Sequence, residues 1–111
     1  MMKNSCLLLS LLLLGVLTSP AYAEIEQYHL VIKNHQFTPD NLVVPAGKKV
    51  KIVVENQDSS PEEFESHDLD REKIITGNSK ASIYVGPLET GSYTFFGEFN
   101  PKTAKGTLTV E

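Results

Sequence analysis

A dense group of oxygen ligands occupies the middle of the sequence. Residues 58–72 hold seven of the fourteen acidic side chains together with one histidine: Asp58, Glu62, Glu63, Glu65, His67, Asp68, Asp70 and Glu72. Carboxylates and imidazoles bind Fe(II), Fe(III), Mn(II) and Cu(II), whereas Cu(I) prefers thiolates and thioethers. The stretch is therefore a candidate cation site. The alternative is a solvated acidic strand whose charges protect a sheet edge.

The alternation of side chains along a strand divides these candidates between two faces. A strand that starts at Glu62 places Glu62 and Phe64 on one face, which we expect to point inward. Glu63, Glu65 and His67 then share the outer face. The sequence therefore predicts one inward carboxylate and a separate outward group of ligands.

The other residues that could do chemistry favour structural roles. His29 lies within an alternating strand and His35 in a polar turn, so we expect neither to bind metal. The adjacent residues Ser66-His67-Asp68 diverge on an extended strand, whereas catalytic triads are assembled from separated positions. No catalytic residue is predicted, and enzymatic activity is left open.

The N-terminal residues 1–23 are typical of a cleaved signal peptide. Lys3 precedes an apolar run over residues 6–18, and the small residues of Ala21-Tyr22-Ala23 form a cleavage site. A membrane anchor is the alternative, but the run is shorter than a bilayer span requires. Cys6 stands at the start of the apolar run rather than after it, which argues against a lipoprotein. We expect residues 24–111 to form one domain outside the cytoplasm.

Cleavage would leave a domain without cysteine or methionine. Without Lys3, nine basic residues remain against fourteen acidic ones, a net charge of −5. This acidic balance argues against nucleic acid, whose phosphates require a basic face. Residues 24–111 also contain no apolar run long enough to span a membrane.

Short alternating segments separated by turn residues predict β-strands. No segment shows a sustained helical period, and turn signals such as Pro45-Ala46-Gly47 recur at short intervals. This pattern predicts an all-β sandwich or barrel. The clearest strand segments are 28–32, 41–44, 49–55, 81–85, 92–96 and 106–110.

A series of motifs follows in order along residues 27–111: Val44-Pro45-Ala46-Gly47, Glu63-Phe64-Glu65, Asp70-Arg71-Glu72-Lys73, Gly86-Pro87-Leu88, Phe96-Gly97-Glu98-Phe99 and a closing 105–110. The series resembles a cupredoxin, and more closely the cupredoxin-like domains of bacterial iron-uptake systems of the EfeO type. The resemblance implies an all-β, cupredoxin-like Greek-key β-sandwich of seven or eight strands. It also implies a periplasmic location and a role in ferrous iron uptake beside a membrane permease.

The sequence departs from the blue-copper cupredoxins at their metal ligands. The resemblance places their first histidine at Glu62, their cysteine at Gly97, their second histidine at Asn100 and their methionine near Ala104. A blue-copper site needs a thiolate and two imidazoles, and the chain has no sulfur after residue 23. We therefore expect no blue-copper chemistry.

Oxygen ligands remain near the position of that site. The resemblance places Glu98 in the loop that carries the cysteine and second histidine of blue-copper proteins, and it implies a histidine where Asn100 stands in iron-associated relatives. With the acidic stretch, these residues give the expected ligands of an iron or Cu(II) ion: Glu62, Glu63, Glu65, His67, Glu98 and Asn100.

Three functions are consistent with this set of residues. The first is a metal-binding accessory of iron uptake, which passes iron to a membrane permease. The second is a ferrous oxidase or electron-transfer component. The third is a metal-free module that docks a partner, since a fold does not by itself imply a function.

Overall fold

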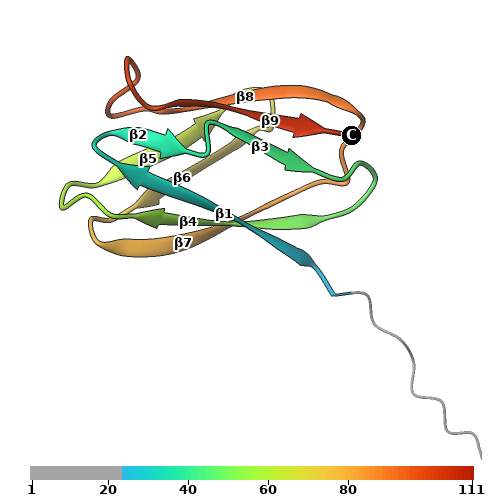
Figure 1. Ribbon diagram of the computed structural model, residues 1–111, viewed down its shortest axis with the longest axis horizontal. Helices are drawn as coiled ribbons and strands as arrows, with labels where there is room; N and C mark the ends of the chain where they lie inside the picture. Colours follow the sequence, from blue (N-terminus) through green and yellow to red (C-terminus); the bar gives the residue numbers. More distant parts are fainter. Residues whose placement is uncertain (1–23) are drawn as a thin grey trace, which may run out of the picture.

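The structure is a computed structural model that describes residues 24–111; the predicted signal peptide, residues 1–23, lies outside the described residues. The described chain contains nine strands and no helix (Figure 1). The strands are β1 (Glu26–Lys33), β2 (Gln36–Thr38), β3 (Asn41–Val44), β4 (Val50–Asn56), β5 (Glu62–Ser66), β6 (Arg71–Ile75), β7 (Ser79–Val85), β8 (Gly91–Gly97) and β9 (Lys105–Val110).

The strands form the two-sheet sandwich that the alternating pattern predicted. One sheet has the order β2-β1-β4-β7 and the other the order β3-β9-β8-β5-β6. Strands β1 and β4 pair in parallel, as do β3 and β9, and the remaining pairs are antiparallel. The Greek-key fold is thus confirmed. The structure has nine strands rather than the expected seven or eight. Two of them were hard to predict, since β2 has only three residues and β6 lacks clear alternation.

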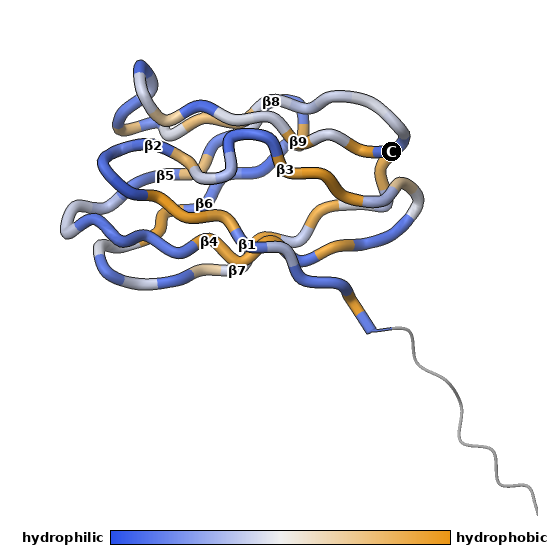
Figure 2. Tube along the Cα trace, in the orientation of Figure 1, coloured by the Kyte–Doolittle hydropathy of each residue, from blue (hydrophilic) through white to orange (hydrophobic). Residues whose placement is uncertain are grey.

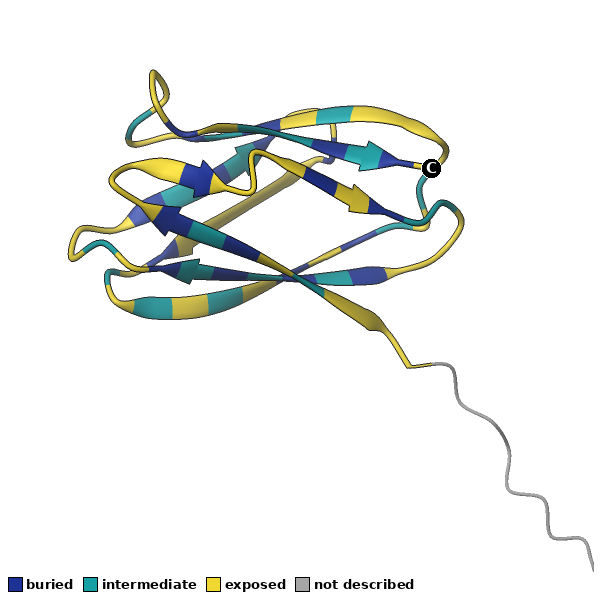
Figure 3. Ribbon diagram, in the orientation of Figure 1, coloured by how far each residue is buried: buried dark blue, intermediate teal, exposed yellow. Residues whose placement is uncertain are grey.

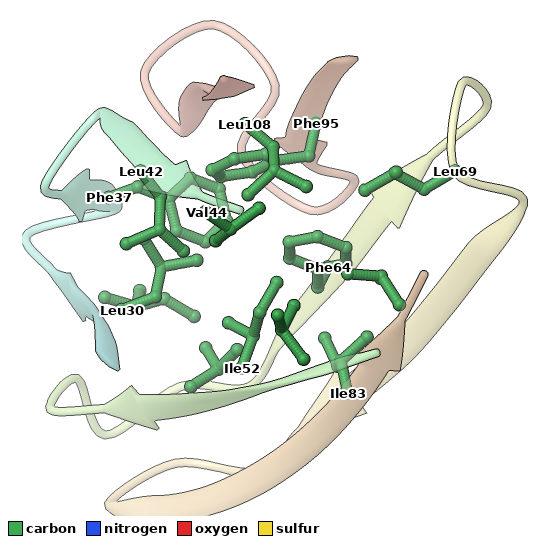
Figure 4. Close-up of a cluster of buried hydrophobic side chains, with 14 of the residues drawn as sticks. Leu30, Phe37, Leu42, Val44, Ile52, Phe64, Leu69, Ile83, Phe95 and Leu108 are labelled. Atoms are coloured by element: carbon green, nitrogen blue, oxygen red, sulfur yellow. The ribbon is translucent and has the colours of Figure 1, made fainter. Parts of the chain in front are cut away.

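The core lies between the two sheets. Buried residues alternate with exposed ones along β3 and with half-buried ones along β4 and β5, so each strand turns one face inward (Figures 2 and 3). Three phenylalanine rings meet at the centre (Figure 4). Phe64 stacks on Phe95 with ring centroids 5.0 Å apart, and the edge of Phe37 packs against both. Full burial of each such side chain is worth about 1.5–3 kcal/mol.

The end of the sandwich that lies to the left in Figure 1 is formed by the loops β1–β2, β4–β5, β6–β7 and β8–β9. We call this region the loop end. The carboxylate of Asp58 in the β4–β5 loop accepts hydrogen bonds from the backbone N–H groups of Asn34 and His35, at 2.8 and 2.9 Å. The buried Asn56 donates to the carbonyl oxygens of Ser60 and Ile75. These bonds fix the loop that leads into β5.

No helix among residues 24–111 has the length and the apolar composition that crossing a bilayer requires.

Candidate functional site

The side chains of residues 62–65, the first four of strand β5, point alternately to the inner and outer faces of the sheet. Glu62 and Phe64 are 1% and 0% exposed and point inward, whereas Glu63 and Glu65 are half-buried on the outer face. The predicted division into one inward and two outward carboxylates is confirmed. The reason is the two-residue period of a strand whose Phe64 must enter the core.

The inward carboxylate of Glu62 is held by three neutral donors. Its Oε1 accepts hydrogen bonds from the backbone N–H groups of Glu63 and Phe99, at 2.9 and 2.8 Å. Its Oε2 accepts a third from the side-chain amide of Asn100, at 2.8 Å. Two of these partners belong to the β8–β9 loop, so Glu62 ties the start of β5 to that loop.

Gly97 and Ala104 lie beside the carboxylate of Glu62. A Cβ atom added to Gly97 would lie 2.6 Å from both Cδ and Oε2 of Glu62, and 2.7 Å from the Cβ of Ala104. Ala104 is itself fully buried. The glycine therefore leaves the space that the carboxylate occupies.

These residues do not fit the copper ion that the fold implies. At the positions where the resemblance places cysteine, histidine and methionine, the chain has Gly97, Asn100 and Ala104. They offer no thiolate, imidazole or thioether, which are the ligands of a blue-copper site. The amide of Asn100 is already used as a donor to Glu62.

A second group of carboxylates gathers on the outer face of the five-stranded sheet. One oxygen of each of Glu63, Glu65 and Glu72 lies within 4.8 Å of the others. Glu65 on β5 is directly opposite Glu72 on β6, while Glu63 is opposite Ile74. We call these three carboxylates the outer cluster. Hard oxygen ligands at this spacing are suited to a divalent or trivalent cation.

The outer cluster is electrostatically strained without a cation. Burial raises the pKa of the Glu63 carboxyl, and the charges of Glu72 and Glu65, a side-chain contact with Glu72 and the charge of Glu98 raise the same pKa further. The ion pairs found within residues 24–111 are His35–Asp58 and His67–Glu65, and neither brings a lysine or an arginine to the cluster. A bound cation would relieve this repulsion.

His67 and Glu98 lie at the rim of the outer cluster. The side chain of His67 is 81% exposed, its Nδ1 is 4.0 Å from Oε2 of Glu65, and its ring centroid is 5.7 Å from that of Phe96. The backbone N–H of Glu98 donates to the carbonyl oxygen of Glu63 at 2.8 Å. Both residues are thus near the cluster but outside its three closest carboxylates.

The structure therefore separates the six predicted ligands into an outer and an inner group. Glu63 and Glu65 form the outer cluster, with His67 and Glu98 at its rim. Glu62 and Asn100 are bonded to each other on the inner side of the sheet. His29 and His35 are exposed, and His35 lies 3.6 Å from the Asp58 carboxylate.

Glu72 is the member of the outer cluster that was not among the predicted ligands. It belongs to β6, an edge strand whose first four residues are all exposed, so no alternation reveals it. The length of the β5–β6 hairpin turn could have revealed it. Four turn residues after Ser66 place Glu65 opposite Glu72. Register of this kind follows from the length of the turn.

Comparisons with known proteins agree with this fold. A family profile described as "Cupredoxin-like domain" matches residues 6–110. An uncharacterized protein of Rickettsia prowazekii is 42% identical over 81 residues, which cover 73% of this chain and 65% of that protein. The matched part thus spans about two thirds of that relative's length.

Solved copper proteins share the architecture at low sequence identity. Auracyanin A, a blue copper protein from Chloroflexus aurantiacus, has a TM-score of 0.68 and 14% identity, covering 79% of this chain and 100% of that one. The metal binding domain of the Cu(I) exporting P-type ATPase CopA of Streptococcus pneumoniae D39 has a TM-score of 0.71 and 18% identity, covering 83% and 91%. A purple cupredoxin from Nitrosopumilus maritimus has a TM-score of 0.59 and 22% identity, covering 75% and 98%. These likenesses show a shared fold, and the family profile, which matches residues 6–110, shows that the chain belongs to the cupredoxin-like domain family.

Proposed function

We propose that this protein is a periplasmic metal-binding accessory of iron uptake, which holds iron or Cu(II) as cargo at the outer cluster. The observation that carries the proposal is the convergence of Glu63, Glu65 and Glu72, whose oxygens lie within 4.8 Å of one another. Glu98 and His67 at the rim would complete the coordination of the ion. A membrane iron permease is the partner that would take the metal from this surface.

The outer cluster suits an exchangeable ion. Two of its residues are half-buried and one is exposed, so one side of a bound ion would face solvent. Its three carboxylates give hard oxygen ligands, which favour Fe(II), Fe(III), Mn(II) or Cu(II) over Cu(I). An ion that stays accessible can be passed to a partner. Several related folds belong to copper proteins, which supports a metal role without defining the metal.

The placement of the carboxylates also favours a ligand role over a solvated edge. Like charges directly opposite in an antiparallel pair destabilise the sheet. Glu65 faces Glu72 on β6 and Phe96 on β8, so it lies inside the sheet rather than along its edge. A carboxylate that only protected the edge would be expected on β6 alone.

Titration calorimetry with Fe(II) under argon and with Cu(II) tests the proposal. We expect one ion per chain for the parent and a loss of affinity of at least about tenfold for Glu63→Gln/Glu65→Gln, because two of three carboxylate ligands are removed. Glu24→Gln/Glu89→Gln is the matched control, since it removes the same charge from exposed positions elsewhere.

The outcomes distinguish the three functions. Equal binding by the two double variants would show that the outer cluster is not the site. A parent that binds neither metal after dialysis would favour a metal-free docking module. Catalytic loss of Fe(II) in air, proportional to protein, would instead identify a ferrous oxidase.

A further inference from the structure

We propose that Glu62 is a structural clasp that takes the place of a metal ion at the loop end, rather than a ligand of one. The resemblance places blue-copper ligands at Glu62 and Asn100, so an ion held by such ligands would join the start of β5 to the β8–β9 loop. Here a carboxylate joins the same two segments through hydrogen bonds. The inference concerns the inner side of the sheet and does not depend on whether metal binds at the outer cluster.

The hydrogen bonds of Glu62 join the start of β5 to the β8–β9 loop. An ionised carboxylate accepts at about four lone-pair positions. Two bonds from the β8–β9 loop, from Phe99 N–H and Asn100 Nδ2, and one from Glu63 N–H occupy three of them. Each donor is neutral, and the carboxylate is 1% exposed. Bonds between a charged acceptor and neutral donors are among the stronger ones, which lets the buried group remain without a cation.

Gly97 is the second part of the clasp. The space beyond its Cα is filled by the Glu62 carboxylate, because a Cβ there would lie 2.6 Å from Cδ and Oε2. Ala104 closes the other side, with its Cβ 2.7 Å from the same point. A side chain at Gly97 and the observed position of Glu62 therefore exclude each other. A cysteine at position 97 could not coexist with the Glu62 carboxylate in its observed place.

The clasp adds to the separation of the two groups of carboxylates that the alternation of β5 already sets. The backbone N–H of Glu63 donates inward to Glu62, and its carbonyl oxygen accepts from Glu98 N–H. These bonds hold the backbone of β5 in the strand geometry that directs the Glu63 side chain to the outer face. A metal that bound Glu62 would have to displace the three bonds that maintain this arrangement.

A swap of donor and acceptor tests the clasp without any metal. Asn100→Asp replaces the amide donor by a second carboxylate 2.8 Å from Oε2 of Glu62, which should destabilise the fold. Glu62→Gln in the same chain restores a donor–acceptor pair, since the glutamine amide can donate to the new carboxylate. Denaturant unfolding in EDTA should show coupling of about tenfold in the folding equilibrium constant.

The matched control uses the next residue on the opposite face. Glu63→Gln removes the same charge, yet its side chain does not reach Asn100, so it should not rescue Asn100→Asp. Additive effects of Glu62→Gln and Asn100→Asp, or equal rescue by Glu63→Gln, would overturn the clasp.

Copper titration of purified protein supplies the second test. Glu62→Gln should bind Cu(II) within about threefold of the parent, because the clasp is not a ligand. If Glu62→Gln abolishes binding while Glu63→Gln and Glu65→Gln bind as the parent does, Glu62 is a ligand and the clasp is overturned. If the parent binds no Cu(II) or Fe(II), the proposed function fails, and the swap of donor and acceptor alone decides the clasp.

Discussion

Glu65 and Glu72 lie directly opposite each other in the antiparallel β5–β6 ladder. Like charges at such positions repel, so removing one should stabilise the metal-free protein while weakening metal binding. We expect Glu72→Gln to raise the free energy of unfolding in EDTA by about 0.5 kcal/mol. The same variant should bind Cu(II) at least about tenfold more weakly, since one of three carboxylate ligands is lost.

Denaturant unfolding and calorimetry on one preparation would measure both effects. Glu89→Gln, at an exposed position outside the sheets, should change neither quantity. A Glu72→Gln variant that is less stable in EDTA than the parent would contradict the repulsion that the geometry implies.

Addition of Cu(II) to the protein should produce only weak visible absorption. An intense blue colour requires a copper–thiolate bond, and residues 24–111 contain no cysteine. Optical and electron paramagnetic resonance spectra of the Cu(II)-loaded protein test this directly. A strong charge-transfer band would show that sulfur reaches the ion and would contradict the assignment of oxygen ligands.

The sequence was sufficient to predict the sandwich and the faces of β5, because both depend on local alternation. Glu62 and Phe64 could be assigned inward from their spacing alone, and both are buried. The strand β2, with three residues, could not be predicted because it is stabilised by its partner rather than by its own pattern. It pairs with β1 through Val31, Ile32 and Lys33.

The site was only partly predictable because its geometry is set by long-range contacts. The register of β6 brings Glu72 into the outer cluster, and β6 itself shows no alternation. The hydrogen bond from Asn100 to Glu62 joins residues 38 positions apart. Sequence spacing therefore could not show that these two side chains are hydrogen-bonded to each other. Local alternation therefore predicted the faces of Glu62, Glu63 and Glu65, but not that Glu72 would join the outer cluster or that Asn100 would donate to Glu62.

Truncation of the central aromatic ring should cost much of the stability of the domain. Phe64 is fully buried and contacts both Phe95 and Phe37. We expect Phe64→Ala to lower the free energy of unfolding by about 4 kcal/mol, through lost burial and the cavity that remains. Phe99→Ala is the control, because Phe99 is 48% exposed and should cost less than about 1 kcal/mol. Similar losses in the two variants would place the core elsewhere.

The carboxylate of Asp58 holds the β1–β2 turn. Asn34 and His35 both have left-handed backbones, with φ values of 54° and 57°, and both donate their N–H groups to Asp58. The pKa of Asp58 lies below its ordinary value of 3.8, chiefly because of the hydrogen bond from His35 N–H. Burial opposes this shift, while the Asn34 N–H and the charges of His35 and Lys33 favour it.

The sign of the pH dependence follows from that lowered pKa. The unfolded chain binds the proton more readily than the folded one, so the ionised group stabilises the fold above pH 3.8. This contribution is lost as the pH falls through the lower pKa of the folded state. Asp58→Asn should therefore cost about 1 kcal/mol at pH 7, because one amide oxygen replaces two carboxylate acceptors, and the difference from the parent should shrink as the pH falls below 3.8 and through the lowered pKa. Denaturant unfolding of both proteins from pH 7 to 2 measures this, with Asp70→Asn as the same chemical change at an exposed turn. A difference that stays constant over that range would mean that Asp58 acts through the shape of its loop rather than through its charge.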